Sequence, residues 1–272
     1  GVKFALKAFF QNEIDIKKTG LTPGLKGKRI IVQGLGNVGY YAAYFLSNED
    51  GAIITHVMER DGSIIDKEGI DISSLKNHLI DKGTIKGFKG FTKSGAEILE
   101  QEADILIPAA MELVINDKNA ERIKTPLIVE AANGPISSDA DEILNKRGVV
   151  IIPDLYANAG GVTVSYFEWI KNLSRIRLGR LQRRAQENQV STLIEGIENM
   201  TGKNFPSEHK LKSIQGASEL DLVRSGLEDT MIETYNVISN VWNSNKDIPD
   251  LRTAAMMVSI KRIAQSYGSL GI

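Results

Sequence analysis

A glycine-rich hexapeptide, residues 34–39, is the part of the sequence best suited to hold a ligand. It consists of Gly-Leu-Gly-Asn-Val-Gly, follows the apolar run "RIIVQ" and precedes a helix predicted from about Asn37 to Ser47. In this setting the first glycine allows a tight turn, the second lets a pyrophosphate approach the backbone, and the third lets helix and strand pack together. The N–H groups at the start of the helix then face the phosphate oxygens. The spacing predicts a dinucleotide-binding turn; the alternative is a glycine-rich turn that binds nothing.

A carboxylate stands where such a turn requires one. Glu59 ends the next predicted strand, 59 − 39 = 20 residues after Gly39. At this place it can accept hydrogen bonds from the adenosine ribose hydroxyls and repel a 2′-phosphate. The neighbouring Arg60 could pair with a 2′-phosphate or simply be a solvated side chain in a turn. These residues favour NAD, with dual use of NADP as an alternative.

Small and amide side chains follow the later strands. In an open α/β sheet, ligands bind beyond the carboxyl ends of the strands. There "ADILIPAA" ends in Ala109 and Ala110, "PLIVEAA" leads to Asn133, and "GVVIIPD" leads to Asn158. Amide groups can donate to and accept from a nicotinamide carboxamide and its ribose, and the alanines would let the ring sit close. Each asparagine could instead serve a turn, because asparagine tolerates left-handed conformations.

The elements that must position these residues alternate along the chain. Nearly continuous apolar strands, each preceded by a helical stretch, run from Lys28 to about Pro153, with "DGSII" as an extra short strand. This pattern predicts an α/β fold with a Rossmann-like, doubly wound, mainly parallel sheet, followed by a helical C-terminal region. The predicted divisions are 1–26 (leading helix and linker), 27–157 (dinucleotide-binding domain) and 158–272 (helical region). The last contains an antenna-like segment at about 174–216 and C-terminal helices within 219–267.

Composition excludes several classes of function. Lys plus Arg is 33 and Asp plus Glu is 34, so the net charge of −1 gives no general attraction to nucleic acid or to an anionic membrane. The absence of cysteine removes disulfides, thiolate catalysis and cysteine-based metal sites. The three histidines lie far apart without a ligand motif, so no catalytic metal is expected. No apolar run reaches the length of a transmembrane helix.

Several long motifs resemble one family. "VQGLGNVG", "DILIPAA", "EAANGP", "IPDLYANAGGVTVSYFEW" and "GASELDLVRSGL" are similar to the cofactor-binding half of glutamate dehydrogenase, in its animal-type, antenna-bearing branch. The resemblance runs from Gly1 to the C-terminus. It implies reversible oxidative deamination of L-glutamate to 2-oxoglutarate and ammonia, and a hexameric parent enzyme. It also implies a cytoplasmic location, or the mitochondrial matrix if the source is eukaryotic.

The resemblance also implies a role for individual residues. The pyrophosphate would lie on Gly34, Gly36, Asn37, Val38 and Gly39, the adenosine ribose on Glu59, and the nicotinamide on Ala109, Ala110, Asn133 and Asn158. Val162 and Ser165 would line the substrate pocket, with the Ser165 hydroxyl on the side-chain carboxylate of the substrate. From the residues alone, a hydroxyl at the start of a helix is equally an N-cap or a packing residue.

The catalytic groups of that family are not expected in this chain. They are a lysine in a Lys-Pro-Gly-Gly-type loop and an aspartate, both from a preceding domain, and no such loop occurs here. The chain alone is therefore expected to be inactive, and turn lysines such as Lys86 and Lys93 are expected to face solvent. One alternative is a leucine- or phenylalanine-type amino-acid dehydrogenase, against which Ser165 and the antenna-like insertion argue. The other is a non-catalytic dinucleotide-binding or oligomer-forming module.

Overall fold

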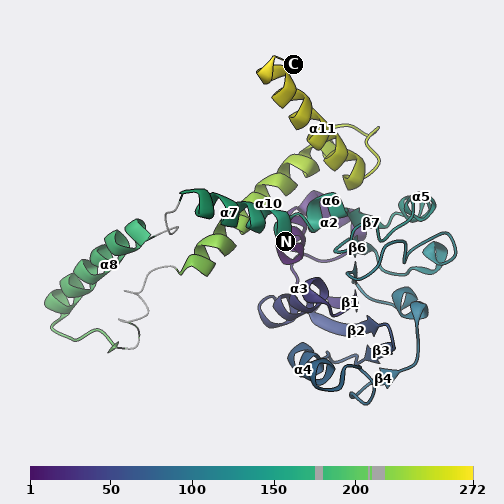
Figure 1. The fold of residues 1–272 in the computed structure, drawn as a ribbon, viewed down its shortest axis with the longest axis horizontal. Helices are drawn as coiled ribbons and strands as arrows, with labels where there is room; N and C mark the ends of the chain where they lie inside the picture. The colour runs from purple at the N-terminus through teal and green to yellow at the C-terminus, as the bar shows by residue number, and fades with distance from the viewer. Residues whose placement is uncertain (175–179, 208, 210–217, 272) are drawn as a thin grey trace. The chain divides into compact units, whose positions relative to one another are not determined.

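The computed structural model describes residues 1–174, 180–207, 209 and 218–271 (Figure 1). By its internal contacts the chain divides into two compact units. The first unit comprises Gly1–Gly160 and Met231–Ile272, and the second comprises Gly161–Thr230. The long helix α10 (Glu219–Ser244) contributes to both units.

A seven-stranded sheet in the order β4-β3-β2-β1-β5-β6-β7 forms the centre of the first unit. Its strands are β1 (Arg29–Gln33), β2 (Ile53–Glu59), β3 (Gly62–Ile65), β4 (Phe91–Thr92), β5 (Ile105–Pro108), β6 (Leu127–Val129) and β7 (Val150–Ile152). Strands β2, β1, β5, β6 and β7 pair in parallel, whereas β3 and β4 extend the β2 edge antiparallel. The predicted α/β fold with a mainly parallel sheet is therefore confirmed. The chain leaves β1 toward β2 and later continues on the other side at β5, so the strand order reverses at β1.

The helices of the first unit are α1 (Val2–Gln11), α2 (Glu13–Thr19), α3 (Asn37–Asn48), α4 (Ile72–Lys82), α5 (Ser138–Lys146), α6 (Asp154–Ala157), the second part of α10, and α11 (Leu251–Leu270). Side-chain caps begin four helices of the described first unit, α2, α4, α5 and α11. The Asp71 side chain caps α4 by accepting the Ser74 N–H at 3.0 Å, and Gly83 ends that helix in the left-handed conformation at φ 67°. At α11 the Asp250 side chain accepts the Thr253 N–H at 2.7 Å.

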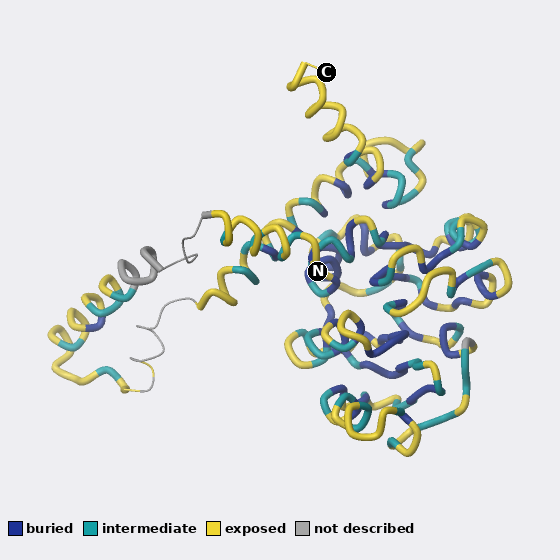
Figure 2. Tube along the Cα trace, viewed as in Figure 1, coloured by how far each residue is buried: buried dark blue, intermediate teal, exposed yellow. Residues whose placement is uncertain are grey.

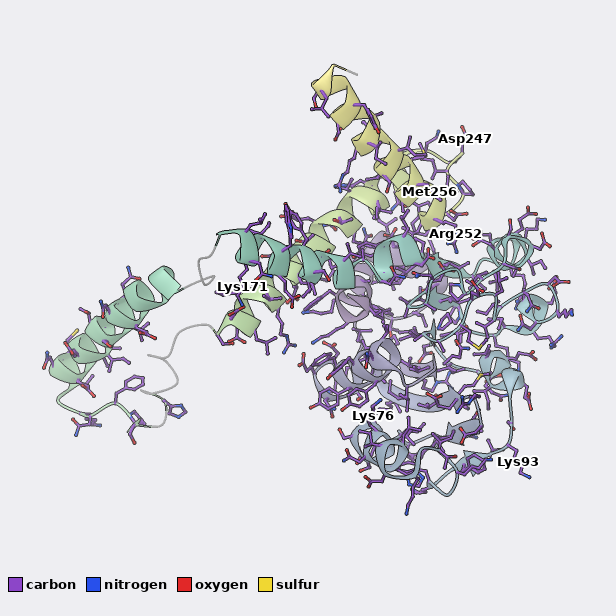
Figure 3. The ribbon with its side chains drawn as sticks, in the orientation of Figure 1. Lys76, Lys93, Lys171, Asp247, Arg252 and Met256 are labelled. Carbon is purple, nitrogen blue, oxygen red and sulfur yellow. The ribbon has the colours of Figure 1, made fainter. Side chains whose placement is uncertain are left out.

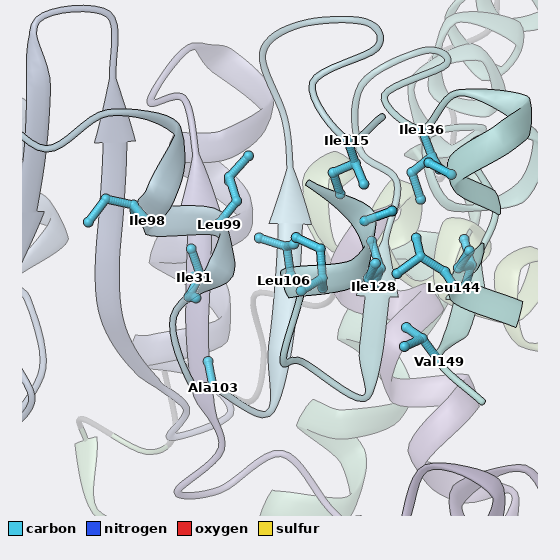
Figure 4. Close-up of a cluster of buried hydrophobic side chains, with 14 residues drawn as sticks. Ile31, Ile98, Leu99, Ala103, Leu106, Ile115, Ile128, Ile136, Leu144 and Val149 are labelled. Atoms are coloured by element: carbon cyan, nitrogen blue, oxygen red, sulfur yellow. The ribbon is translucent and has the colours of Figure 1, made fainter. Parts of the chain in front are cut away.

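Buried aliphatic side chains from successive parallel strands form a continuous core. Ile31 on β1, Leu106 on β5 and Ile128 on β6 are each 0% exposed and lie in one cluster with Leu144 of α5 (Figure 4). Strands that are buried on both faces read as nearly continuous apolar runs, which explains the patterns in the sequence. Figure 2 shows the buried segments concentrated on these strands. This core holds the carboxyl ends of the strands in fixed register.

The connection from β5 to β6 differs from the sequence-based expectation of a helical stretch. The structure has only a short 3-10 helix, η2 (Ala120–Arg122), before β6, and another, η1 (Ala96–Glu100), before β5. Asn119 explains the first case, because its side chain accepts the Asn116 N–H at 2.8 Å and donates to the Val114 carbonyl at 2.9 Å. Such local side-chain bonds offer the backbone an alternative to a regular helix.

The second unit consists of helices. It contains α7 (Gly160–Ser174), α8 (Arg180–Thr201) and the first part of α10. Helices α7 and α10 meet through an ion pair between Lys171 and Glu219 and through Phe167, which lies against Gly226. Part of the antenna-like segment predicted at 174–216, namely 175–179, 208 and 210–216, lies outside the described residues. The antenna therefore stays a prediction. In the described parts of the chain, no helix is long and apolar enough to cross a membrane.

Candidate functional site

The turn after β1 can be built only with a glycine at its first position. Gly34 has φ +89°, a conformation that costs an L-residue energy. A Cβ at this position would lie 2.6 Å from the Cβ of Ala110, which follows β5. The Gly34 N–H donates to the Met58 carbonyl of β2 at 2.7 Å. The turn is thus fixed between the ends of β2 and β5.

Gly39 lets α3 pack directly onto this turn. A Cβ at Gly39 would overlap the carbonyl oxygen of Gly34 and lie 2.9 Å from the Gly34 carbonyl carbon and 3.3 Å from the Ala109 Cβ. Gly39 is buried, as is Leu35 within the turn. No larger residue fits here unless the backbone moves.

Gly36 lies on the open side of the same turn. It is the N-cap residue of α3 with no capping side chain, and a Cβ there would have no neighbour within 4 Å. Gly36, Asn37 and Val38 are all exposed. The first N–H groups of a helix have no partner within the helix and attract anions. The turn around Gly36 therefore offers a pyrophosphate both room and donors, and the residues present fit a dinucleotide.

Glu59 is attached to this turn. It ends β2, is half-buried, and its Oε1 accepts the N–H of Leu35. The Leu35 carbonyl in turn accepts a hydrogen bond from Lys76 Nζ of α4 at 2.9 Å. The Glu59 carboxylate is thereby held at the edge of the glycine turn. An adenosine ribose would lie there if a dinucleotide were bound at this turn.

A pocket of about 670 Å³ opens beside Glu59. The charged and amide side chains that line this Glu59 pocket belong to Gln33, Glu59, Arg60, Asp61, Lys86 and Lys93. Lys86 and Lys93 are exposed, as the sequence predicted, but they also line this pocket, which the sequence did not predict. Lys93, which Figure 3 labels, directly follows β4, the two-residue strand that pairs with β3. Sequence reasoning found β3 but not β4, so it had no means of placing Lys93 near Glu59.

Gln33 is a further residue of this pocket that sequence reasoning missed. Its side chain is 3% exposed, and its Oε1 is buried without a hydrogen-bond partner among the described residues. A buried polar atom without a partner is costly unless a ligand or a water satisfies it. Besides the open turn at Gly36, this unpaired acceptor at the end of β1 is a second observation that fits a polar ligand.

The structure brings the two predicted asparagines together. Asn133 follows β6, Asn158 is the C-cap residue of α6, and the Asn158 Nδ2 donates to Asn133 Oδ1 at 2.6 Å. Ala109, at the end of β5, donates its N–H to the Gln33 carbonyl at 2.9 Å. The carboxyl ends of β1, β5, β6 and β7 therefore carry the predicted glycines, alanines and asparagines on one edge of the sheet.

Val162 and Ser165 belong to the second unit. Both lie in the first part of α7 and are exposed, Val162 to 75%. The Ser165 Oγ donates to the Gly161 carbonyl at 3.2 Å, one turn earlier. Ser165 is therefore not an N-cap, which was one of the two structural alternatives for this hydroxyl. Among the described residues, no group of three or more His, Asp or Glu is arranged to hold a metal ion.

Comparison with known proteins identifies relatives along nearly the whole chain. A probable glutamate dehydrogenase of Sinorhizobium fredii is 47% identical over 268 residues, which cover 97% of this chain and 60% of that protein. The mitochondrial glutamate dehydrogenase of Dictyostelium discoideum is 44% identical over 274 residues, 100% of this chain and 54% of that protein. The chain thus spans only a little more than half the length of these relatives.

Solved structures share the fold. The hetero-hexameric glutamate dehydrogenase from Thermus thermophilus superposes with a TM-score of 0.72 at 23% identity, over 99% of this chain and 53% of that one. The glutamate dehydrogenase from Peptoniphilus asaccharolyticus gives a TM-score of 0.62 at 23% identity, with coverage of 99% and 53%. The family model for glutamate/leucine/phenylalanine/valine dehydrogenases matches residues 8–224, from within α1 to within α10. The chain therefore belongs to the glutamate/leucine/phenylalanine/valine dehydrogenase family.

Proposed function

We propose that this chain is the NAD(P)-binding part of a glutamate dehydrogenase. The enzyme to which it contributes would catalyse the reversible oxidative deamination of L-glutamate to 2-oxoglutarate and ammonia. The observation that carries the proposal is the open Gly36 turn at the strand-order reversal, between buried Gly34 and buried Gly39. The names of the relatives support the choice of substrate, since both carry the glutamate dehydrogenase designation.

Each strand end would bind one part of the nucleotide. The first-turn N–H groups of α3, with Gly34, Gly36, Asn37, Val38 and Gly39, would bind the pyrophosphate. Glu59 would accept from the adenosine ribose, and Ala109, Ala110, Asn133 and Asn158 would orient the nicotinamide. The bound cofactor would supply the hydride acceptor. The residues of this chain bind and orient it.

The charges of the Glu59 pocket bear on the choice between NAD and NADP. Glu59 repels a 2′-phosphate, but the pocket is lined by three cations (Arg60, Lys86, Lys93) and two carboxylates (Glu59, Asp61), a balance of 3 − 2 = +1. Asp61 also accepts a hydrogen bond from the Thr84 hydroxyl, which lowers its pKa. NAD is the proposed cofactor, and the cations allow NADP as a second one.

A fluorescence titration of the chain with NADH and NADPH tests both points. Glu59→Gln keeps an oxygen that can accept the Leu35 N–H but removes the charge, so NADPH binding should tighten by about tenfold relative to NADH. Lys93→Ala should weaken NADPH more than NADH. Lys146→Ala is the matched control, because Lys146 is an exposed lysine paired with Glu142 on α5. Failure of the chain to bind either nucleotide would refute the proposal.

We also propose that the chain does not turn over glutamate by itself. The catalytic lysine and aspartate implied by the family resemblance have no counterpart in this sequence, and Val162 and Ser165 would only line the substrate pocket. An assay of the purified chain with glutamate and NAD should show no turnover. Turnover at about 10 s⁻¹, a typical enzyme rate, would contradict this.

The amino acids that other dehydrogenases of the family oxidise are the main alternative substrates. In the full-length enzyme, Ser165→Ala should lower activity on glutamate without a matching loss on leucine if the hydroxyl contacts a side-chain carboxylate. A parent enzyme that prefers leucine or phenylalanine would refute glutamate specificity. A parent that binds NADH but oxidises none of these amino acids would favour a non-catalytic module. The hexameric state and the cytoplasmic or mitochondrial location also remain proposals, and sedimentation of the full-length protein tests the first.

A further inference from the structure

A fully buried carboxylate stands directly after β6. Glu130 is 0% exposed, and its Oε2 accepts the N–H of Asp154 at 2.8 Å. Asp154 is the first residue of α6, just beyond β7. Glu130 therefore joins the carboxyl ends of two neighbouring parallel strands. Burial raises the pKa of Glu130, and the facing Arg252 opposes that shift.

The charge that balances Glu130 comes from the start of α11. Arg252 Nη2 lies 2.9 Å from Glu130 Oε1, and its Nε donates to Asp141 Oδ1 of α5 at 3.0 Å. Its Nη1 lies 3.7 Å from Asp154 Oδ1. One planar guanidinium thus faces three carboxylates from three elements, a geometry that a lysine cannot reproduce.

The same group of contacts continues to the asparagine pair. Asp154 Oδ2 accepts the N–H of Gly134 at 2.8 Å, and Gly134 has φ +53°. Gly134 follows Asn133, whose Oδ1 accepts from Asn158 Nδ2 at 2.6 Å. An unbroken series of contacts therefore leads from the Arg252 guanidinium through two carboxylates to both amide side chains.

We propose that Arg252 is a positioning residue for the Asn133–Asn158 pair, and through it for the nicotinamide end of the bound nucleotide. This inference rests on the proposed function, which places the nicotinamide at these asparagines. Without the guanidinium, Glu130 would be a buried charge without its cation, and Asp154 would lose the positive charge that faces it. The loop at Gly134 would then no longer be held in one position.

Calorimetric titrations with NADH and with ADP-ribose distinguish positioning from general damage. ADP-ribose retains the pyrophosphate and the adenosine but lacks the nicotinamide. In Arg252→Met, NADH affinity should fall by about tenfold while ADP-ribose affinity changes less than about twofold. Arg122→Met is the matched control, because Arg122 makes two 2.7 Å bonds to Glu100 at an exposed position on η2. Equal weakening of both nucleotides, or of neither, would overturn the proposal.

Backbone hydrogen exchange tests the positioning without any nucleotide. In Arg252→Met the Gly134 and Asp154 amides, whose acceptors are the two carboxylates, should exchange at least about tenfold faster. The Gly34 amide, which donates to the Met58 carbonyl, should keep its rate. Unchanged rates at Gly134 and Asp154, or equal acceleration at Gly34, would refute the positioning role.

Two further outcomes separate this inference from the proposed function. If the wild-type chain binds neither nucleotide, the proposed function fails, and the exchange rates alone decide whether Arg252 holds the loop. If Arg252→Met does not fold, Arg252→Lys takes its place, since it keeps the positive charge but lacks the planar guanidinium. The lysine variant should then show smaller changes of the same kind in NADH affinity and in the exchange of the Gly134 and Asp154 amides. Wild-type affinities and exchange rates in a folded Arg252→Lys would contradict the need for a guanidinium.

Discussion

Two glycines of one turn should respond in opposite ways to the addition of a single methyl group. Gly39→Ala should destabilise the first unit, because the new Cβ would overlap the Gly34 carbonyl oxygen and lie 2.9 Å from its carbonyl carbon. Gly36→Ala should leave stability unchanged, because its Cβ meets no atom within 4 Å and its φ of −64° suits any residue. Gly36→Ala should instead weaken dinucleotide binding, since the methyl group would occupy the open side of the turn.

The expected magnitudes follow from these contacts. Carbon atoms attract optimally at about 3.5–4.0 Å, and overpacking a fixed site costs roughly 1–3 kcal/mol. The atoms that block Gly39 belong to backbone, which no rotamer change can move, so the upper value of about 3 kcal/mol applies. Alanine regains about 1 kcal/mol of helix propensity, which leaves a net loss of about 2 kcal/mol. For Gly36→Ala, the reduced entropy of the unfolded chain and the poorer N-cap nearly cancel, to within about 0.5 kcal/mol.

Thermal unfolding followed by circular dichroism, together with NADH titration of each folded variant, measures both effects. Gly39→Ala should lower Tm by about 4–8 °C, given about 2–4 °C per kcal/mol for a chain of this size. Gly36→Ala should unfold like the wild type yet bind NADH at least about tenfold more weakly. A Gly39→Ala variant as stable as wild type would refute the packing argument. Unchanged NADH affinity in Gly36→Ala would refute the place assigned to the pyrophosphate.

Three other substitutions test the elements that carry the site. Asp71→Ala should cost about 1 kcal/mol at neutral pH by removing the N-cap of α4. Hydrogen bonds from the Ser74 side chain and backbone lower the pKa of Asp71 in the folded chain. The stabilisation by this cap should therefore be complete at pH values above the ordinary pKa of an aspartate, and it should be lost as the pH falls through the lowered pKa of Asp71. Urea unfolding at several pH values measures this dependence. Tyr235→Phe should cost about 1.5–3 kcal/mol, because the Tyr235 hydroxyl donates to fully buried Asp15 at 2.6 Å; a neutral result in the same assay would contradict that. Leu106→Ala should cost about 2–5 kcal/mol by opening a cavity in the core, and a loss below about 1 kcal/mol would mean that the cluster collapses around it.

The parts of the fold that the sequence predicted well depend on local information. Strands buried on both faces appear as apolar runs, and the β1–α3 turn appears as three glycines because its geometry leaves no room for Cβ atoms at Gly34 and Gly39. The cap at Asp71 is local in the same sense, since an N-cap acts within three residues of itself. The carboxyl ends of parallel strands share one edge, so the approach of Asn133 to Asn158 also followed from the order of the elements.

Contacts between residues that are far apart in the sequence leave much weaker patterns in the sequence. Glu130 follows an apolar strand without a break, and that position alone indicates a buried carboxylate in need of a partner. The partner is one of 33 lysines and arginines, and it lies 122 residues away in the sequence. Only the packing of α11 beside β7 and α6 identifies it as Arg252. The residues that bind a ligand in such a sheet can therefore be found from local patterns, whereas the residues that hold them in place require the tertiary structure.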